Sequence, residues 1–396
     1  MRDTVKLGRI GGIPIGVNWS IIAVAVYLAA TLTLAALPRW FPSADLTSRV
    51  IASVFTTLLF FLSILVHELG HAIVAKRHGI EVDGITLWLL GGIARLRQQA
   101  STPAAEFQVA AAGPAGSFAM ALVFAGAAIG LDRLSSWQLA AGASGWLAIV
   151  NLLLALSNLI PAAPLDGGRV LTSILWWRNG DAERSRILSA RCGLVLGAVL
   201  VAGFTTAFFV LDELAAWLVV FGVGTGLFLA HAAVGEISGA VIRGRLQSTT
   251  TQAVMTTHPP SVPDSLTVGQ FLNWAGTEGG HTACPVVRWD FEPIGYVAPS
   301  ALGSVPTPDR SWTTLSQVMT PAPNVARAWS TESVAEVLER LGDDKHSVIV
   351  LHNPDDSSPV GTLTRPQLDQ LFASPTLWGI DKKMPAPPQS PDLSTV

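Results

Sequence analysis

Long apolar runs alternate with short charged connections over the first 240 residues of the chain. Read as helices, these runs are long enough to cross the roughly 30 Å hydrocarbon core of a bilayer. The pattern therefore predicts an α-helical polytopic membrane protein with about six transmembrane helices. The expected spans are residues 21–37, 50–75, 107–131, 134–165, 192–211 and 214–235.

After Arg245 the pattern changes to polar, Pro- and Thr-rich sequence with short apolar runs of strand length. An internal repeat is present in this part. Val254-Met255-Thr256 recurs as Val318-Met319-Thr320, and Gly295-Tyr296-Val297 recurs as Gly361-Thr362-Leu363. Both copies predict an α+β unit. We expect helices at residues 265–272 and 330–341, and strands at 286–287, 294–297, 348–351 and 360–363.

The distribution of Lys and Arg predicts the orientation in the membrane. With a cytoplasmic N-terminus, the outer loops contain three basic residues, Arg39, Arg49 and Arg133. The inner segments then contain thirteen: Arg2, Lys6, Arg9, Lys76, Arg77, Arg95, Arg97, Arg178, Arg184, Arg186, Arg191, Arg243 and Arg245. Because cytoplasmic loops carry the excess of basic residues, we expect both termini in the cytoplasm.

Composition agrees with a membrane protein that carries a soluble part. Half of the residues are hydrophobic and only 13% are charged, whereas soluble domains have about 25% charged residues. The net charge of −3 gives no indication of nucleic-acid binding. Cys192 and Cys284 are the only cysteines, and they fall in different regions. They predict neither a disulfide framework nor a cysteine metal site.

The second apolar run contains an H-E-x-x-H motif. Its only ionisable side chains are His67, Glu68 and His71. On a helix the two histidines lie one turn apart on the same face, so both imidazoles can bind one metal ion. Glu68 is placed to accept a proton from a water molecule at that metal. Ionisable groups at membrane depth are costly, and a functional site is their usual explanation.

The fourth run is interrupted by a segment that cannot be regular helix. Residues 158–169 contain Pro161, Pro164, Gly167 and Gly168 around Asp166. Irregular backbone at membrane depth is tolerated only where it is buried in protein or lines a wet cavity. We therefore expect this segment to border a site.

A catalytic zinc needs a third protein ligand in addition to the two histidines. The metzincin pattern would place Gly at 74 and His at 77, but the chain has Val74 and Arg77. Glu81 and Glu106 are candidates, although we expect both to lie in an exposed cytoplasmic connection. Asp166 ranks first because its expected depth matches that of the histidines. The alternative for Asp166 is an ion pair with Arg169 one turn away.

Residues 85–96 contain two short apolar runs joined by Gly91 and Gly92. This pattern predicts either a membrane-associated β-hairpin or a loop on the membrane surface. A hairpin would offer a free edge to which an extended peptide can add.

Taken together, His67 to His71 and Asn158 to Gly168 resemble the paired motifs of the site-2 protease family, which are intramembrane zinc metalloproteases. Gly91-Gly92 and residues 112–116 resemble the same family, over residues 1–240. The resemblance implies one zinc per chain, bound by His67, His71 and Asp166, with Glu68 as general base. It implies that Asn158 orients the substrate backbone or the developing oxyanion.

The repeat resembles a tandem pair of cystathionine-β-synthase (CBS) domains, at residues 246–310 and 311–373. The resemblance implies a regulatory or dimerising module, and in that family a Thr and a later Asp often contribute to an adenine-nucleotide site. Here Thr364 matches, but Gln367 stands where the Asp is expected. The Pro-rich tail at residues 374–396 is predicted to be disordered.

The function expected from these features is regulated intramembrane proteolysis. The partners are a membrane-protein substrate with a transmembrane helix, the lipid bilayer and a second copy of the chain through the CBS pair. The expected location is the plasma membrane. The alternative is a CBS-regulated transporter or channel, in which the same polar residues would line a pore. A pore does not require Glu68 between two histidines at ligand spacing.

Overall fold

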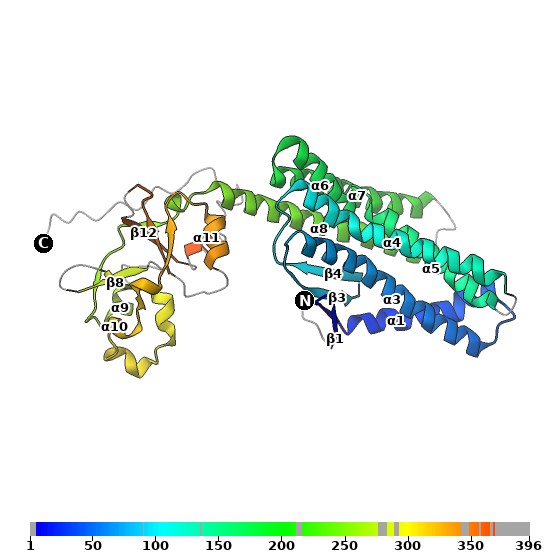
Figure 1. Cartoon of the computed structure of the whole chain (residues 1–396), viewed down its shortest axis with the longest axis horizontal. Helices are drawn as coiled ribbons and strands as arrows, with labels where there is room; N and C mark the ends of the chain where they lie inside the picture. Colours follow the sequence, from blue (N-terminus) through cyan, green and yellow to red (C-terminus); the bar gives the residue numbers. More distant parts are fainter. Residues whose placement is uncertain are drawn as a thin grey trace. The chain divides into compact units, whose positions relative to one another are not determined.

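The computed structural model describes residues 5–89, 91–134, 137–210, 216–275, 283–288, 293–341, 348–355, 358–364 and 367–368. The expected tail at 374–396 lies outside these residues. The chain divides into two compact units, Met1–Val241 and Ile242–Val396, and each is described by itself (Figure 1).

Six helices of the described residues are long and apolar enough to cross a membrane, which confirms the expected number. The first span, Ser20–Trp40, contains α1 (Ser20–Thr31), a π-helical turn (Leu32–Ala36) and α2 (Leu37–Trp40). The other five spans are α3 (Leu46–Arg77), α4 (Pro103–Asp132), α5 (Gln138–Asn158), α7 (Ala182–Val210) and α8 (Ala216–Ser248).

Local sequence explains where the two central helices begin. Asp45 caps α3 by accepting a hydrogen bond from the Ser48 N–H at 3.1 Å. Thr102 caps α4 in the same way, accepting from the Ala105 N–H at 3.2 Å, and Pro103 occupies the first helical position. A short polar side chain is preferred at the N-cap because its oxygen accepts from a free backbone N–H. Proline is preferred at the first helical position because an N–H there would have no partner within the helix.

The expected break in the fourth run is present. Helix α5 ends at Asn158, and a separate short helix, α6 (Asp166–Asn179), begins at Asp166. The first turn of α6 packs closely against the irregular segment. A Cβ on Gly168 would lie 2.6 Å from the carbonyl carbon of Ala162, so only glycine allows this approach.

The expected hairpin is confirmed, and it belongs to a larger sheet. Strands β3 (Val82–Trp88) and β4 (Gly91–Leu96) pair antiparallel and lie along α3 (Figure 1). Strand β4 begins at Gly91, so both glycines belong to β4. The sequence had suggested instead that they join the two strands. The full strand order is β1-β2-β3-β4, with β1 (Val5–Ile10) and β2 (Ile13–Val17) from the N-terminal segment. Strand β4 therefore has a free edge.

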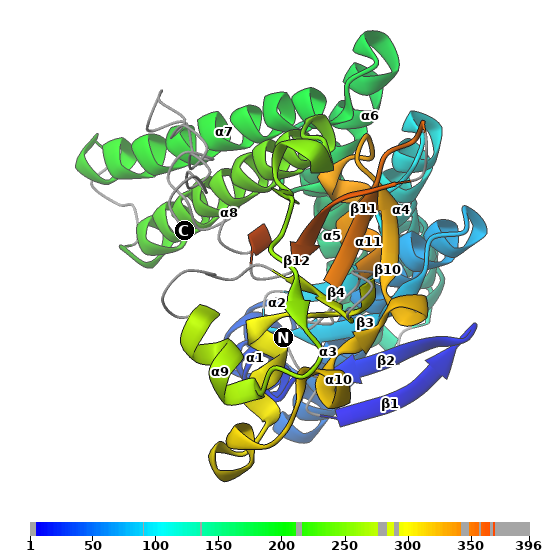
Figure 2. The ribbon, with the colours of Figure 1, turned by 90° about the vertical axis from the view of Figure 1, so that its left-hand side faces the viewer.

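The second unit contains two four-stranded sheets, as expected for a tandem repeat. One has the order β6-β7-β8-β9 and the other β10-β11-β12-β5. Figure 2 shows β10, β11 and β12 side by side. The strands are β5 (Thr256–Thr257), β6 (Val262–Pro263), β7 (Cys284–Val287), β8 (Pro293–Val297), β9 (Thr320–Pro321), β10 (Ala326–Trp329), β11 (Val348–His352) and β12 (Pro359–Thr364), with helices α9 (Val268–Trp274), α10 (Leu315–Val318) and α11 (Val334–Leu341).

The two repeats exchange their first strands. Strand β5, from the first V-M-T start, pairs with β12 of the second copy, and β9 pairs with β8 of the first copy. A buried cluster that includes Tyr296, Val348 and Val350 joins the two copies. Each structural repeat therefore contains a strand that the sequence repeat assigns to the other copy.

Candidate active site

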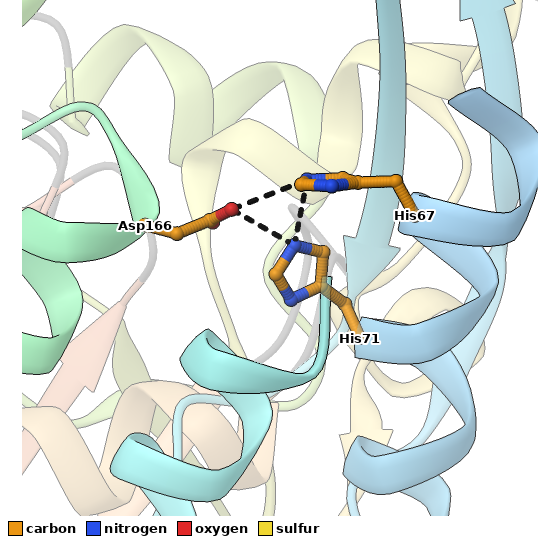
Figure 3. A group of neighbouring side chains, drawn as sticks. All are labelled: His67, His71 and Asp166. Carbon is orange, nitrogen blue, oxygen red and sulfur yellow. Dashed lines mark hydrogen bonds and ion pairs between the residues drawn. The ribbon is translucent and has the colours of Figure 1, made fainter. Parts of the chain in front are cut away.

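Three side chains from two helices meet beside β4. Helix α3 provides His67 and His71, each 6% exposed, and the first residue of α6 provides Asp166. The two Nε2 atoms lie 3.2 Å apart, and each lies 3.2 Å from Asp166 Oδ2 (Figure 3). The structure thus brings together the two motif histidines and the carboxylate that ranked first as third ligand.

The donor atoms fit a tetrahedral metal ion. In a tetrahedron with metal–ligand distances of about 2.0 Å, the ligand atoms are about 3.3 Å apart. The three observed separations are all 3.2 Å. Asp166 Oδ2 is buried and has no hydrogen-bond donor among the described residues. A buried carboxylate oxygen that faces two ring nitrogens provides a donor set suited to a cation between them.

Helix α4 orients both imidazoles. His67 Nδ1 lies 2.9 Å from Ser117 Oγ, and His71 Nδ1 lies 2.7 Å from the carbonyl oxygen of Val109. A carbonyl only accepts, so His71 Nδ1 donates its proton and the neutral ring leaves Nε2 free for a metal. Such contacts on the second nitrogen determine the tautomer of metal-binding histidines.

The same helix approaches both Nε2 atoms most closely at Gly113. A Cβ at this position would collide with His71 Nε2 and would lie 2.8 Å from His67 Nε2. Gly113 is therefore required by the close approach of α4 to the two ligand atoms.

Replacing Gly113 by Ala is expected to lower zinc affinity strongly, because the methyl group would occupy the space of the ligand atoms. Helix propensity alone would favour the variant by about 1 kcal/mol. Gly126→Ala on the same helix is the matched control, because a Cβ there meets no atom within 4 Å. Zinc bound per chain after dialysis against buffered free zinc checks the prediction. Equal zinc in the two variants would contradict it.

Glu68 points to β4 rather than to the two histidines. Its Oε2 accepts a hydrogen bond from the Ala94 N–H at 3.1 Å. A Cβ on Gly92 would lie 2.9 Å from the carboxyl carbon of Glu68. Glycine at 92 therefore lets the strand edge approach the acid.

A cavity of about 530 Å³ contains these groups. Its polar lining includes the three candidate ligands, Glu68, Arg169 and Asn158, and β4 lines it from Gly91 to Ala94 and at Leu96. Phe60, Phe61, Ile64 and Leu154 supply part of the apolar lining. Asn158 is half-buried and donates to the carbonyl of Leu154 at 3.0 Å. All residues that the sequence proposed for the site therefore border one cavity.

One expectation about the neighbouring charges is wrong, and the alternative for Asp166 is not what the structure shows. Glu106 is not exposed but 4% accessible, since α4 begins before it. Arg169 pairs with Glu106 Oε1 at 2.9 Å, whereas the carboxylate of Asp166 faces the histidines. Glu81 lies at the surface and pairs with Arg97. The residues of α4 that orient the histidines were not predicted, and their one signal is a serine within a span.

Comparisons with known proteins agree with this geometry. The model of peptidase family M50 matches residues 55–141 and 133–202. Over 377 residues the chain is 33% identical to Rip3 of Mycobacterium tuberculosis, which is described as a zinc metalloprotease, and the alignment covers 94% of this chain and 93% of Rip3.

Two solved structures are similar to separate parts of the chain. The Site-2 Protease from Methanocaldococcus jannaschii is 26% identical, with a TM-score of 0.40, and covers 59% of this chain and 94% of that chain. The CBS domain pair of protein MJ0100 is 17% identical, with a TM-score of 0.26, and covers 32% of this chain and 96% of that chain.

The nearly full-length alignment with Rip3 matters most, because it spans both the helices of the cavity and the repeats that follow. This chain therefore belongs to peptidase family M50, the site-2 proteases, and is a multi-pass intramembrane zinc metalloprotease followed by a unit of two α+β repeats.

Proposed function

We propose that His67, His71 and Asp166 bind one zinc ion per chain and that Glu68 is the general base in peptide hydrolysis. The observation that supports this most directly is the triangle of donor atoms at 3.2 Å, with an unsatisfied carboxylate oxygen at one corner. Zinc bound there would supply a Lewis acid that polarises a carbonyl and activates water near neutral pH. The protein's own residues would transfer the proton and bind the substrate.

Glu68 would take the proton of the attacking water and deliver it to the leaving amine. Its carboxylate lines the same cavity as the three ligands, and the Ala94 N–H holds one of its oxygens. Proton transfer by a positioned carboxylate usually contributes about 10²–10⁴-fold to the rate.

We propose that the substrate adds to the free edge of β4 as an extended strand. The Ala94 N–H points to Glu68, away from β3, and Gly92 has the same orientation because it lies two residues before Ala94. The edge therefore faces the general base. Main-chain pairing there would stabilise a substrate helix that has unwound locally, and a helix must unwind before its carbonyls are accessible.

Asn158 is proposed to contact the substrate backbone near the cut. It ends α5 at the wall of the cavity, and its Nδ2 is engaged by the carbonyl of Leu154. An amide group at this place can donate to a substrate carbonyl once it exchanges this local partner.

Purified protein in detergent is expected to contain one zinc per chain. A chelator should remove the zinc and stop cleavage of a reconstituted membrane substrate, and added zinc should restore both. Elemental analysis and gel-based cleavage measure the two quantities. Cleavage that persists after zinc has been removed would disprove the metal mechanism.

The CBS module is proposed to regulate or dimerise the protease, with residues 246–310 and 311–373 as its repeats. An adenine nucleotide is its proposed ligand. The residues that would contact the nucleotide, however, differ from the family pattern near Thr364, where Gln367 replaces the expected Asp. Gln367 Oε1 accepts from the Thr364 hydroxyl at 3.0 Å, and its Nε2 donates to Thr256 Oγ1 at 2.6 Å. A regulatory or dimerising role is therefore proposed ahead of nucleotide binding.

The protease unit is proposed to comprise residues 1–240 and to lie in the plasma membrane with both termini in the cytoplasm. The excess of Lys and Arg in the inner segments supports this orientation.

A further inference from the structure

One face of the N-terminal half of α4 lies along the candidate site. The residues on this face are Glu106, Val109, Gly113 and Ser117. Their spacings of three, four and four residues place them in one row along the helix. Ser117 and Val109 orient the two histidines, and Gly113 leaves space for the ligand atoms. Glu106 is the member of the row for which the proposed reaction has no use.

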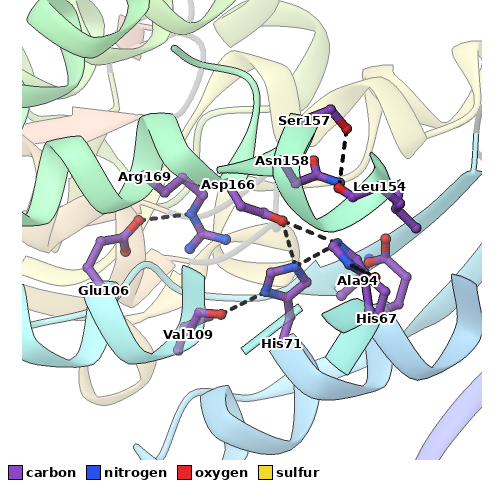
Figure 4. A network of polar contacts seen from close by, with 12 residues as sticks. His67, His71, Ala94, Glu106, Val109, Leu154, Ser157, Asn158, Asp166 and Arg169 are labelled. Atoms are coloured by element: carbon purple, nitrogen blue, oxygen red, sulfur yellow. Dashed lines mark hydrogen bonds and ion pairs between the residues drawn. The ribbon is translucent and has the colours of Figure 1, made fainter. Parts of the chain in front are cut away.

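Glu106 connects this row to the helix of the third ligand. Its Oε1 accepts a hydrogen bond from Arg169 Nε at 2.9 Å (Figure 4). The Glu106 side chain is 5% exposed and that of Arg169 is 35% exposed. Burying charges costs free energy, and apolar residues often replace such a pair without loss of stability. Stability alone is therefore a weak reason for this pair.

Asp166 differs from the two histidines in how it is held. Each histidine has a hydrogen-bond partner on α4 at Nδ1, whereas Asp166 is on another helix and its Oδ2 faces the two Nε2 atoms. Its side chain also does not cap α6, because Leu165 is the N-cap residue. Metal-binding carboxylates usually need a partner outside the coordination sphere. Because Asp166 is the first residue of α6, its position depends on how the first turn of α6 is held.

Arg169 is the residue that can fix the first turn of α6 against α4. It follows Asp166 by three residues, so the two side chains lie on one face of α6. Both line the catalytic cavity, and Figure 4 shows the guanidinium between Glu106 and Asp166. Arg169 also lines an adjoining cavity of about 470 Å³, together with Glu106.

We propose that the Glu106–Arg169 ion pair is a positioning device for the metal site. It holds the α6 turn that carries Asp166 at the correct distance from the helix that orients His67 and His71. The inference deepens the proposed function, because it rests on zinc binding by these three residues. Neither Glu106 nor Arg169 is a ligand in this arrangement.

Glu106→Gln tests the proposal, because it keeps the shape of the side chain and removes its charge. Changes to residues that support metal ligands from outside the coordination sphere usually lower metal affinity by about 10–100-fold, and we expect a loss in this range. Competition with a chromophoric zinc chelator measures the affinity in full-length protein. Replacing zinc by Co²⁺ adds a spectroscopic readout, since the visible bands report the ligand geometry. These bands should change in the variant.

Glu183→Gln is the matched control. Glu183 forms an ion pair with Arg186 within α7, and these side chains are 10% and 12% exposed. This pair does not connect α4 with α6, so its loss should leave zinc affinity and the Co²⁺ spectrum unchanged. Arg169→Lys keeps the cation but not the planar fork, and we expect an affinity between those of wild type and Glu106→Gln.

The outcomes separate this inference from the proposed function. If wild type binds zinc and Glu106→Gln binds it equally well with an unchanged Co²⁺ spectrum, the positioning role is wrong and the metal site stands. If wild type binds no zinc, both proposals are wrong. If Glu106→Gln does not fold, Glu106→Asp replaces it, since it keeps the charge on a shorter side chain. Unchanged affinity in both Glu106→Asp and Arg169→Lys would then overturn the inference.

Discussion

Replacing Glu68 by Gln is expected to leave zinc binding unchanged and to lower the rate of proteolysis by about 10²–10⁴-fold, the usual contribution of a positioned acid or base. The amide keeps the shape of the side chain but cannot accept a proton from water. It can still meet the Ala94 N–H through its carbonyl oxygen, so β4 should keep its place. Zinc per chain and the rate of substrate cleavage are measured on the same preparation.

The control for this variant is Glu81→Gln. Glu81 is an exposed acid that pairs with Arg97 outside the catalytic cavity. Its loss should change neither quantity, because surface ion pairs contribute about 0–1 kcal/mol. If Glu68→Gln cleaves as fast as wild type, Glu68 is not the general base. If it loses zinc, the carboxylate has a role in the metal site that the geometry does not indicate.

The second large effect is expected for Asp166→Asn, which should lower zinc affinity by about two to three orders of magnitude. Structural zinc binds with roughly 10–16 kcal/mol shared among four ligands, so one ligand accounts for about 3–4 kcal/mol. The amide has nearly the same volume, and Gly167 and Gly168 should still pack against the irregular segment. Proteolysis should fall with zinc occupancy and recover in part at high zinc.

Asp132→Asn is the corresponding control, since Asp132 is an exposed acid at the C-terminal end of α4. Isothermal titration of zinc into both variants, each first depleted of metal, measures the difference. Wild-type affinity in Asp166→Asn would show that this carboxylate is not a ligand. The search for a third ligand would then return to Glu106, which is buried nearby but engaged by Arg169.

Much of the site could be predicted because its parts are local. His67 and His71 lie one helical turn apart, and any helix through them aligns the two rings. The prolines and glycines around Asp166 predict the break in the helix before it. We expected His67, His71 and Asp166 to lie close together because their predicted depths in the membrane match. The structure places their three donor atoms together.

Other features could not be predicted, because they depend on contacts between distant segments and no local sequence pattern indicates them. Glu106 looked like part of an exposed connection, and only the start of α4 at Pro103 and the contact with Arg169 make it a buried residue. The N-terminal strands β1 and β2 were not predicted, and parallel pairing of β2 with β3 adds them to the sheet. The exchange of β5 and β9 between the two C-terminal repeats also joins distant segments.

The sequence by itself determined the six spans, the H-E-x-x-H helix and the broken segment that ends at Asp166. These follow from apolar length, helical spacing and the backbone limits of proline and glycine, which act within one segment. Only the tertiary structure decided that one face of α4 orients both histidines and meets Arg169, and that the edge of β4 faces Glu68. Such relations depend on how separate helices and strands pack, and packing is settled by contacts between residues far apart in the chain.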